Sequence, residues 1–74
     1  MSKPDWNIAP HWANWLAADT TIDPSKPEYW VWFEDEPVWN DGGWLLGEGG
    51  GKWDQTAFDV PVGYDTPNSL ERRP

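Results

Sequence analysis

The sequence predicts a mainly β protein, a small antiparallel meander of three or four strands that forms a single domain over residues 1–74. Three features predict this fold: an aromatic and β-branched run at Glu28–Glu34, a turn signal at Asn40–Gly43, and an alternating apolar pattern at Phe58–Tyr64. The alternative is an α+β fold, in which residues 10–18 form a short helix packed on a hairpin.

The first element, within Ala9–Ala18, fits both a strand and a helix. Helical spacing relates Ile8, Trp12, Trp15 and Leu16. In a strand, the same segment would place Trp12 and Leu16 on one face and Trp15 on the other. We expect the strand, because the next predicted strand needs a partner. The segment Asp19–Pro27 is rich in Asp, Ser and Pro and is expected to be a turn or loop.

The strand Glu28–Glu34 has two apolar faces. Tyr29, Val31 and Phe33 share one face, and Trp30 and Trp32 share the other. A single sheet in so small a protein does not easily bury both sides. Either loops of the chain or a partner must therefore cover the second face.

The second half of the chain is punctuated by Pro and Gly. Pro37 ends the preceding strand, and the turn at Asn40–Gly43 leads into a short strand at Trp44–Leu46. Gly47–Lys52 is expected to be a flexible loop. The strand Phe58–Tyr64 contains Pro61, which lacks an N–H donor, so it should lie at the edge of the sheet or cross it as a strap. Residues 1–7 and 65–74 are expected to be flexible ends.

The composition limits how the domain is stabilised. A chain of 74 residues buries only about 60% of its unfolded surface, so its core is marginal. It has no Cys and a single His, which excludes disulfides and makes a structural zinc site a poor fit. Packing of large side chains, for which eight Trp are available, and homo-oligomerisation are the remaining routes.

The charge is strongly acidic, with 5 Lys and Arg against 13 Asp and Glu and a net charge of −8. This sign opposes direct binding to nucleic acid or to anionic membranes, and favours a basic protein surface as partner. The longest apolar run, Tyr29–Phe33, is too short to span a membrane. Because no apolar segment follows the first residues, we expect a cytoplasmic protein.

No group of residues predicts catalysis, a cofactor or a metal. His11 is the only imidazole and is expected to be a partly exposed histidine without a catalytic role. Glu34 and Glu36 would lie about 7 Å apart on a strand, as in an inverting glycosidase, but the chain is too short to enclose a substrate. The acidic residues at 34–41 lack the spacing of a calcium-binding loop.

The order of residues over the first half of the chain is distinctive: Asp5-Trp6, Ala9-Pro10, Trp12-Ala13, Trp15, Ala18-Asp19, Tyr29-Trp30, Trp32-Phe33-Glu34, Pro37 and Gly43-Trp44. This order resembles small tryptophan-rich proteins of tailed bacteriophages, which are mostly uncharacterised accessory products. The resemblance covers residues 5–44 and departs at Thr20–Pro27, where such proteins tend to have a tight Asp-Gly turn. It implies a small phage product made inside the infected host cell, and it brings no catalytic residues.

These observations predict a small, acidic, non-enzymatic interaction protein that binds and modulates a host or phage protein. The expected partner-binding surface is an aromatic patch with an acidic rim, formed by Trp30, Trp32, Glu34, Asp35, Glu36, Trp39, Asp41 and Trp44. In one version of this function, the carboxylates mimic nucleic-acid phosphates on an inhibited DNA-binding partner. A structural or virion-associated module and a glycan-binding module are the alternatives.

Overall fold

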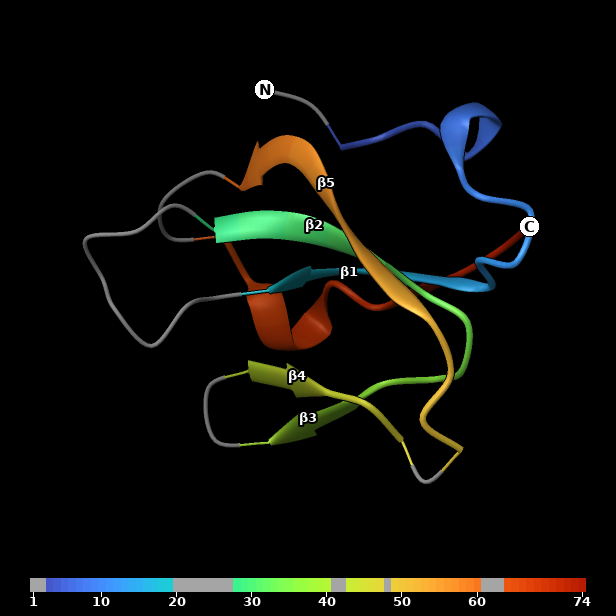
Figure 1. Ribbon diagram of the computed structural model, residues 1–74. Helices are drawn as coiled ribbons and strands as arrows, with labels where there is room; N and C mark the ends of the chain where they lie inside the picture. The colour runs from blue at the N-terminus through green and yellow to red at the C-terminus, as the bar shows by residue number, and fades with distance from the viewer. Residues whose placement is uncertain (1–2, 20–27, 41–42, 48, 61–63) are drawn as a thin grey trace.

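The computed structural model describes residues 3–19, 28–40, 43–47, 49–60 and 64–74 (Figure 1). It confirms the mainly β, antiparallel fold. The strands are β1 (Trp15–Asp19), β2 (Glu28–Phe33), β3 (Val38–Asn40), β4 (Gly43–Leu45), β5 (Trp53–Val60) and β6 (Glu71–Arg72). Two short 3-10 helices, η1 (Trp6–Ile8) and η2 (Thr66–Asn68), complete the described elements.

The main sheet has four strands in the order β5-β2-β1-β6, and β3 pairs with β4 in a separate two-stranded sheet. All pairings are antiparallel. The β3–β4 hairpin is inserted in the chain between β2 and β5, which are neighbours in the main sheet (Figure 1). The expected turn of this hairpin includes residues 41–42, which lie outside the described residues, but Asn40 and Gly43 on either side of it are paired.

Residues 15–19 form a strand, so the alternative of a helix over residues 10–18 is not realised. The physical reason is that β1 is an inner strand, hydrogen-bonded to β2 on one edge and to β6 on the other. Leu16, Ala17 and Ala18 are all fully buried, which requires apolar contacts on both faces of this strand. The pairing of β1 with β2 therefore decides the conformation of this segment, although its apolar residues also have helical spacing.

The chain itself covers both apolar faces of β2. On one face lies the first core layer, formed by Ala13, Leu16, Ala18, Trp30, Trp32 and Val60, with Trp6, Ala9, Trp12 and Phe58 packed against it. On the other lies the second core layer, formed by Ala17, Val31, Phe33 and Trp44, with Trp15, Trp39 and Leu70 packed against it. The N-terminal segment therefore covers one face of the sheet, and the β3–β4 hairpin covers the other.

Strand β5 begins at Trp53, five residues before the predicted start at Phe58, and ends at Val60. It is an outer strand of the main sheet, as predicted. The end of the predicted strand includes residues 61–63, which lie outside the described residues. The register of β5 on β2 shifts between Tyr29 and Val31, and this irregularity accommodates extra residues of β5 opposite Trp30.

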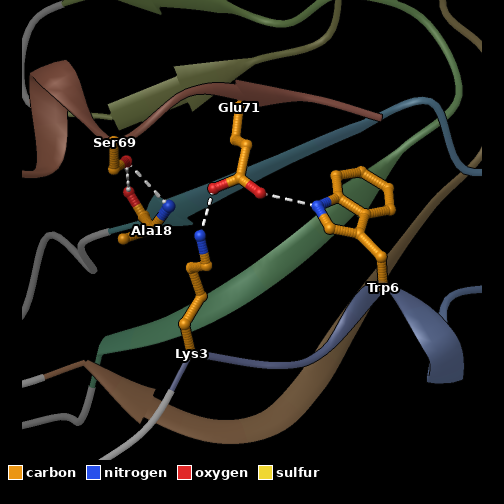
Figure 2. Close-up of polar contacts among 5 residues, drawn as sticks. All are labelled: Lys3, Trp6, Ala18, Ser69 and Glu71. Atoms are coloured by element: carbon orange, nitrogen blue, oxygen red, sulfur yellow. Dashed lines mark hydrogen bonds and ion pairs between the residues drawn. The ribbon is translucent and has the colours of Figure 1, made fainter. Parts of the chain in front are cut away.

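The two ends of the chain make defined contacts, which the prediction of flexible ends over residues 1–7 and 65–74 did not anticipate. Trp6 Nε1–H donates to Glu71 Oε1 at 2.6 Å, and Lys3 forms an ion pair with Glu71 (Figure 2). Ser69 Oγ accepts the N–H of Ala18 at 2.9 Å (Figure 2). Since β6 supplies the second edge partner of β1, the C-terminal segment is part of the sheet.

Arg73 binds the C-terminal segment to the segment that precedes β1. Its guanidinium Nη1 donates to the carbonyl oxygens of Pro10 at 3.1 Å and Ala13 at 2.6 Å. Its backbone N–H donates to the carbonyl of Asn14 at 2.8 Å. The guanidinium also lies 5.6 Å from the centre of the Trp6 ring, within cation–π range. Polar residues that resemble a disordered tail in the sequence thus satisfy carbonyls of the segment before β1.

Candidate functional site

The structure buries most of the tryptophans that were expected to form an exposed binding patch. Trp30 is 1% exposed, Trp32 is 4% exposed and Trp44 is also buried, while Trp39 is partly buried. Asp41 lies outside the described residues. The prediction that the Trp30 and Trp32 face is exposed is therefore wrong. The two indoles are buried because residues 3–14 pack over this face, and they form the core that a small domain needs.

Ring contacts hold the tryptophan side chains within the two layers. The Trp6 ring packs on Trp32 with centroids 4.9 Å apart, and this contact fixes the N-terminal segment on the first core layer. Trp39 and Trp44 are cross-strand neighbours in the hairpin, with ring centroids 5.4 Å apart in an edge-to-face arrangement. Both arrangements are favourable for aromatic pairs and leave little aromatic surface for a partner.

The predicted acidic rim, Glu34, Asp35 and Glu36, packs against the Gly-rich loop. Lys52 N–H donates to Glu34 Oε1 at 3.0 Å, and Glu34 N–H donates to the Lys52 carbonyl at 2.9 Å. A Cβ at Gly49 or Gly51 would lie only 2.6 or 2.8 Å from Asp35 Oδ2. The loop thus approaches the Asp35 side chain closely, and a side chain at either glycine would require Asp35 to move. Asp35 and Glu36 are both exposed, whereas Glu34 is partly buried.

A polar depression of about 450 Å³ borders the same corner. It is lined by Asn14, Trp15, Glu34, Asp35, Glu36, Arg72, Arg73 and Pro74. Two arginines thus lie beside the three carboxylates, and the Arg72 guanidinium stands 5.9 Å from the centre of the Trp15 ring. Because opposite charges share this depression, it is not the purely acidic rim that the sequence suggested.

An apolar hollow lies between the hairpin and β5. It has a volume of about 250 Å³ and is lined by Asp19, Val31, Phe33, Trp44, Leu45, Leu46 and Trp53. We call these residues the β4–β5 groove. Val31, Phe33 and Trp44 are buried and form its floor. Trp53, Leu45 and Leu46 are 56%, 51% and 43% exposed, so three large apolar side chains at the groove are open to water.

The groove follows from the difference in width between the sheet and the hairpin. Trp53 is the cross-strand partner of Phe33, which places its side chain on the same face as the second core layer. The hairpin is held over β1, because Trp44 N–H donates to Asp19 Oδ1 at 3.1 Å. Trp44 Nε1–H also donates to the Thr66 carbonyl at 3.3 Å. The hairpin thus covers β1 and β2 but leaves Trp53 on β5 exposed.

Among the predicted site residues that the structure describes, only Trp44 lines this groove. Sequence reasoning missed Trp53, Leu45 and Leu46. Trp53 follows the Gly-rich loop directly, and the sequence pattern predicts no strand at this position. Its pairing with Phe33 across the sheet depends on the register of β5, which the sequence does not reveal.

The described residues offer no metal-binding cluster of three or more His, Cys, Asp or Glu side chains. In the same parts of the chain, no helix is both long and apolar enough to cross a membrane. His11 is exposed in the turn that follows η1. The groove can therefore bind a ligand mainly through apolar contacts, and one carboxylate, Asp19, is part of its lining.

Comparisons of this chain with protein-family models, with curated proteins and with solved structures give no significant match.

Proposed function

We propose that this chain is a small non-enzymatic interaction protein that binds a basic surface of another protein through the β4–β5 groove. The observation that carries the proposal is the exposure of Trp53, Leu45 and Leu46 around an open apolar groove in a chain of net charge −8. Trp is among the residues that contribute most to protein interfaces. A strong negative charge steers a basic partner toward the surface and speeds association.

The lining of the groove favours a protein partner over a glycan. Sugars are recognised by several convergent polar groups placed around an aromatic platform. Here the floor is Val31, Phe33 and Trp44, and the one carboxylate of the lining, Asp19, accepts the N–H of Trp44. An apolar side chain of a protein matches this lining better than a hydroxyl-rich ring does.

The acidic charge supports the same class of partner. With 13 carboxylates and 5 basic side chains, the chain repels phosphates and anionic lipids. A nucleic-acid-binding protein is one partner with a suitable basic surface, and occupation of that surface would inhibit it. The resemblance to accessory proteins of tailed bacteriophages suggests that the partner is a host or phage protein in the infected cell.

Affinity capture from the host-cell lysate, with the whole chain immobilised, tests the proposal. We expect a basic protein to be captured at low salt and released at high salt, because the encounter depends on charge. Its purified form should then bind the chain in solution with the same salt dependence. Retention that does not change between low and high salt contradicts the role of the charge. Recovery of the chain from purified virions, with no captured partner, would instead favour a structural role.

A further inference from the structure

We infer that the β4–β5 groove takes one large apolar side chain from an extended segment of the partner, and that a Lys or Arg of the same segment pairs with Asp59 beside the groove. This inference rests on the proposed function and identifies the kind of sequence that the groove recognises. It follows from three properties of the described residues: the size of the groove, the rigidity of its floor, and the placement of carboxylates along it.

The size of the groove fits a side chain. Its volume of about 250 Å³ lies below the range of roughly 300–1,000 Å³ that is typical of pockets for small molecules and cofactors. Its lining residues Leu46 and Trp53 are exposed, so the groove is open to solvent. One large aliphatic or aromatic side chain can therefore enter while the backbone that carries it stays outside.

The floor of the groove is fixed before any partner binds. Trp44 has both of its N–H groups engaged, one by the Asp19 carboxylate and one by the Thr66 carbonyl. Val31 and Phe33 belong to the central strand β2 and are buried in the second core layer. Because only the exposed walls need to become ordered, little conformational entropy is lost when a side chain is inserted.

Two carboxylates, Asp19 and Asp59, lie at the opposite end of this face from Trp53. Asp19 and Asp59 are the two cross-strand partners of Tyr29, and Trp53 is the partner of Phe33. Residues 29 and 33 point to the same face of β2 and are four residues apart, which is about 13 Å along a strand. The face of the groove thus has an aromatic end at Trp53 and an acidic end at Asp59, whose side chain is exposed.

This arrangement sets the spacing of the recognised sequence. An extended peptide advances about 3.3 Å per residue, and a Lys or Arg side chain adds several ångströms of reach. The basic residue should therefore lie two to four positions from the apolar one. A second copy of this chain is a poorer occupant, because each copy carries a charge of −8 and self-association would oppose like charges.

Selection from a library of random dodecapeptides displayed on phage, against the folded whole chain, tests the inference. We expect enriched peptides to carry Leu, Ile, Phe or Trp with a Lys or Arg two to four positions away. The best synthetic peptide should lose about tenfold or more in affinity to the Trp53→Ala and Leu46→Ser variants, since anchor contacts dominate such interfaces. The Asp59→Asn variant should bind more weakly and with less dependence on salt.

The matched control is Ile8→Ser, since Ile8 is similarly exposed but belongs to η1 in the segment that covers the first core layer. This variant should bind the peptide as the original chain does. Circular dichroism and thermal unfolding show whether each variant is folded. Two groove variants in different segments of the chain are used, one after β4 and one in β5, so that misfolding of one leaves the other as the test.

Enrichment of peptides without a basic residue, or equal binding by the Trp53→Ala and original chains, would overturn the inference. A concentration-dependent dimer in sedimentation experiments, abolished by Trp53→Ala, would assign the groove to a second copy and overturn it as well. If a basic protein is captured from lysate equally by all groove variants, the proposed protein-binding function stands and only the groove assignment fails. Absence of both captured protein and enriched peptides would refute both.

Discussion

The two substitutions Leu16→Ala and Leu46→Ala make the same chemical change at positions that the structure distinguishes sharply. Leu16 is 0% exposed and lies in the first core layer, as the cross-strand partner of Trp32. Truncation of such a leucine costs about 2–5 kcal/mol, because the surrounding side chains only partly fill the cavity. A domain of 74 residues has a free energy of unfolding of about 4–11 kcal/mol, so this loss is a large part of it.

Leu46 has 43% of its surface exposed, and its truncation should cost about 1 kcal/mol or less. For a domain of this size, about 1 kcal/mol lowers the melting temperature by roughly 4–8 °C. We therefore expect a decrease of about 12–24 °C for a cost of about 3 kcal/mol at Leu16, and a decrease below about 8 °C for Leu46→Ala.

Urea unfolding followed by tryptophan fluorescence, together with thermal unfolding, measures both variants. The dependence of the unfolding free energy on urea concentration should stay the same, which shows that the two free energies can be compared. If Leu16→Ala costs less than about 1 kcal/mol, or if the two variants cost the same, the assignment of Leu16 to the core is wrong. The Leu46 variant also separates stability from binding, because it should keep the fold while it weakens peptide binding.

Three further predictions test contacts that hold the fold. Ser69→Ala leaves the N–H of the buried Ala18 without its acceptor and should destabilise the protein by about 1–3 kcal/mol in urea unfolding, whereas a loss near zero would show that the hydrogen bond is dispensable. Burial acts to raise the pKa of Glu71, but the hydrogen bonds and positive charge of its partners outweigh this effect and lower the pKa from 4.5. The stability from this carboxylate should thus be complete above pH 4.5 and be lost as the pH falls through the lowered native pKa; Glu71→Gln should remove this component from the pH profile, and identical profiles would contradict it. Gly50 and Gly51 both have positive φ, 74° and 72°, but a Cβ has open space only at Gly50. Gly51→Ala should therefore lower the melting temperature more than Gly50→Ala does, and equal decreases would refute the close approach of a carboxylate to this loop.

Local patterns in the sequence were sufficient for two of the strands in the central region, β2 and β4. Glu28–Phe33 is a strand because β-branched and aromatic residues favour a pleated backbone, and Pro37 follows to end it. The turn signal at Asn40–Gly43 predicted the short strand that follows it, and β4 lies there. The strand before the turn, β3, was not predicted. Each of these predictions depends on residues that are near in sequence, so no distant contact was needed to make it.

The contacts of the chain's ends were not predicted, because their residues are polar and their partners are distant in the sequence. Glu71 bonds with Lys3 and Trp6, and Arg73 with carbonyls of residues 10 and 13. These partners are separated by about sixty residues or more, and neither hydropathy nor spacing reveals such pairs. The early part of β5 was missed for a related reason, since Trp53 and Asp54 become a strand only beside β2.

The sequence by itself determined the β class of this protein, its acidic charge, and the presence of a strand with two apolar faces at β2. These properties follow from composition and from the alternation of side chains along an extended backbone. Only the tertiary structure decided which aromatic residues face water. Trp30 and Trp32 are covered by the N-terminal segment, while Trp53 stays exposed because the hairpin ends short of β5. The exposure of a side chain depends on which distant segment packs over its face of the sheet. For this reason Trp30 and Trp32 belong to the core, whereas Trp53 belongs to a candidate binding surface.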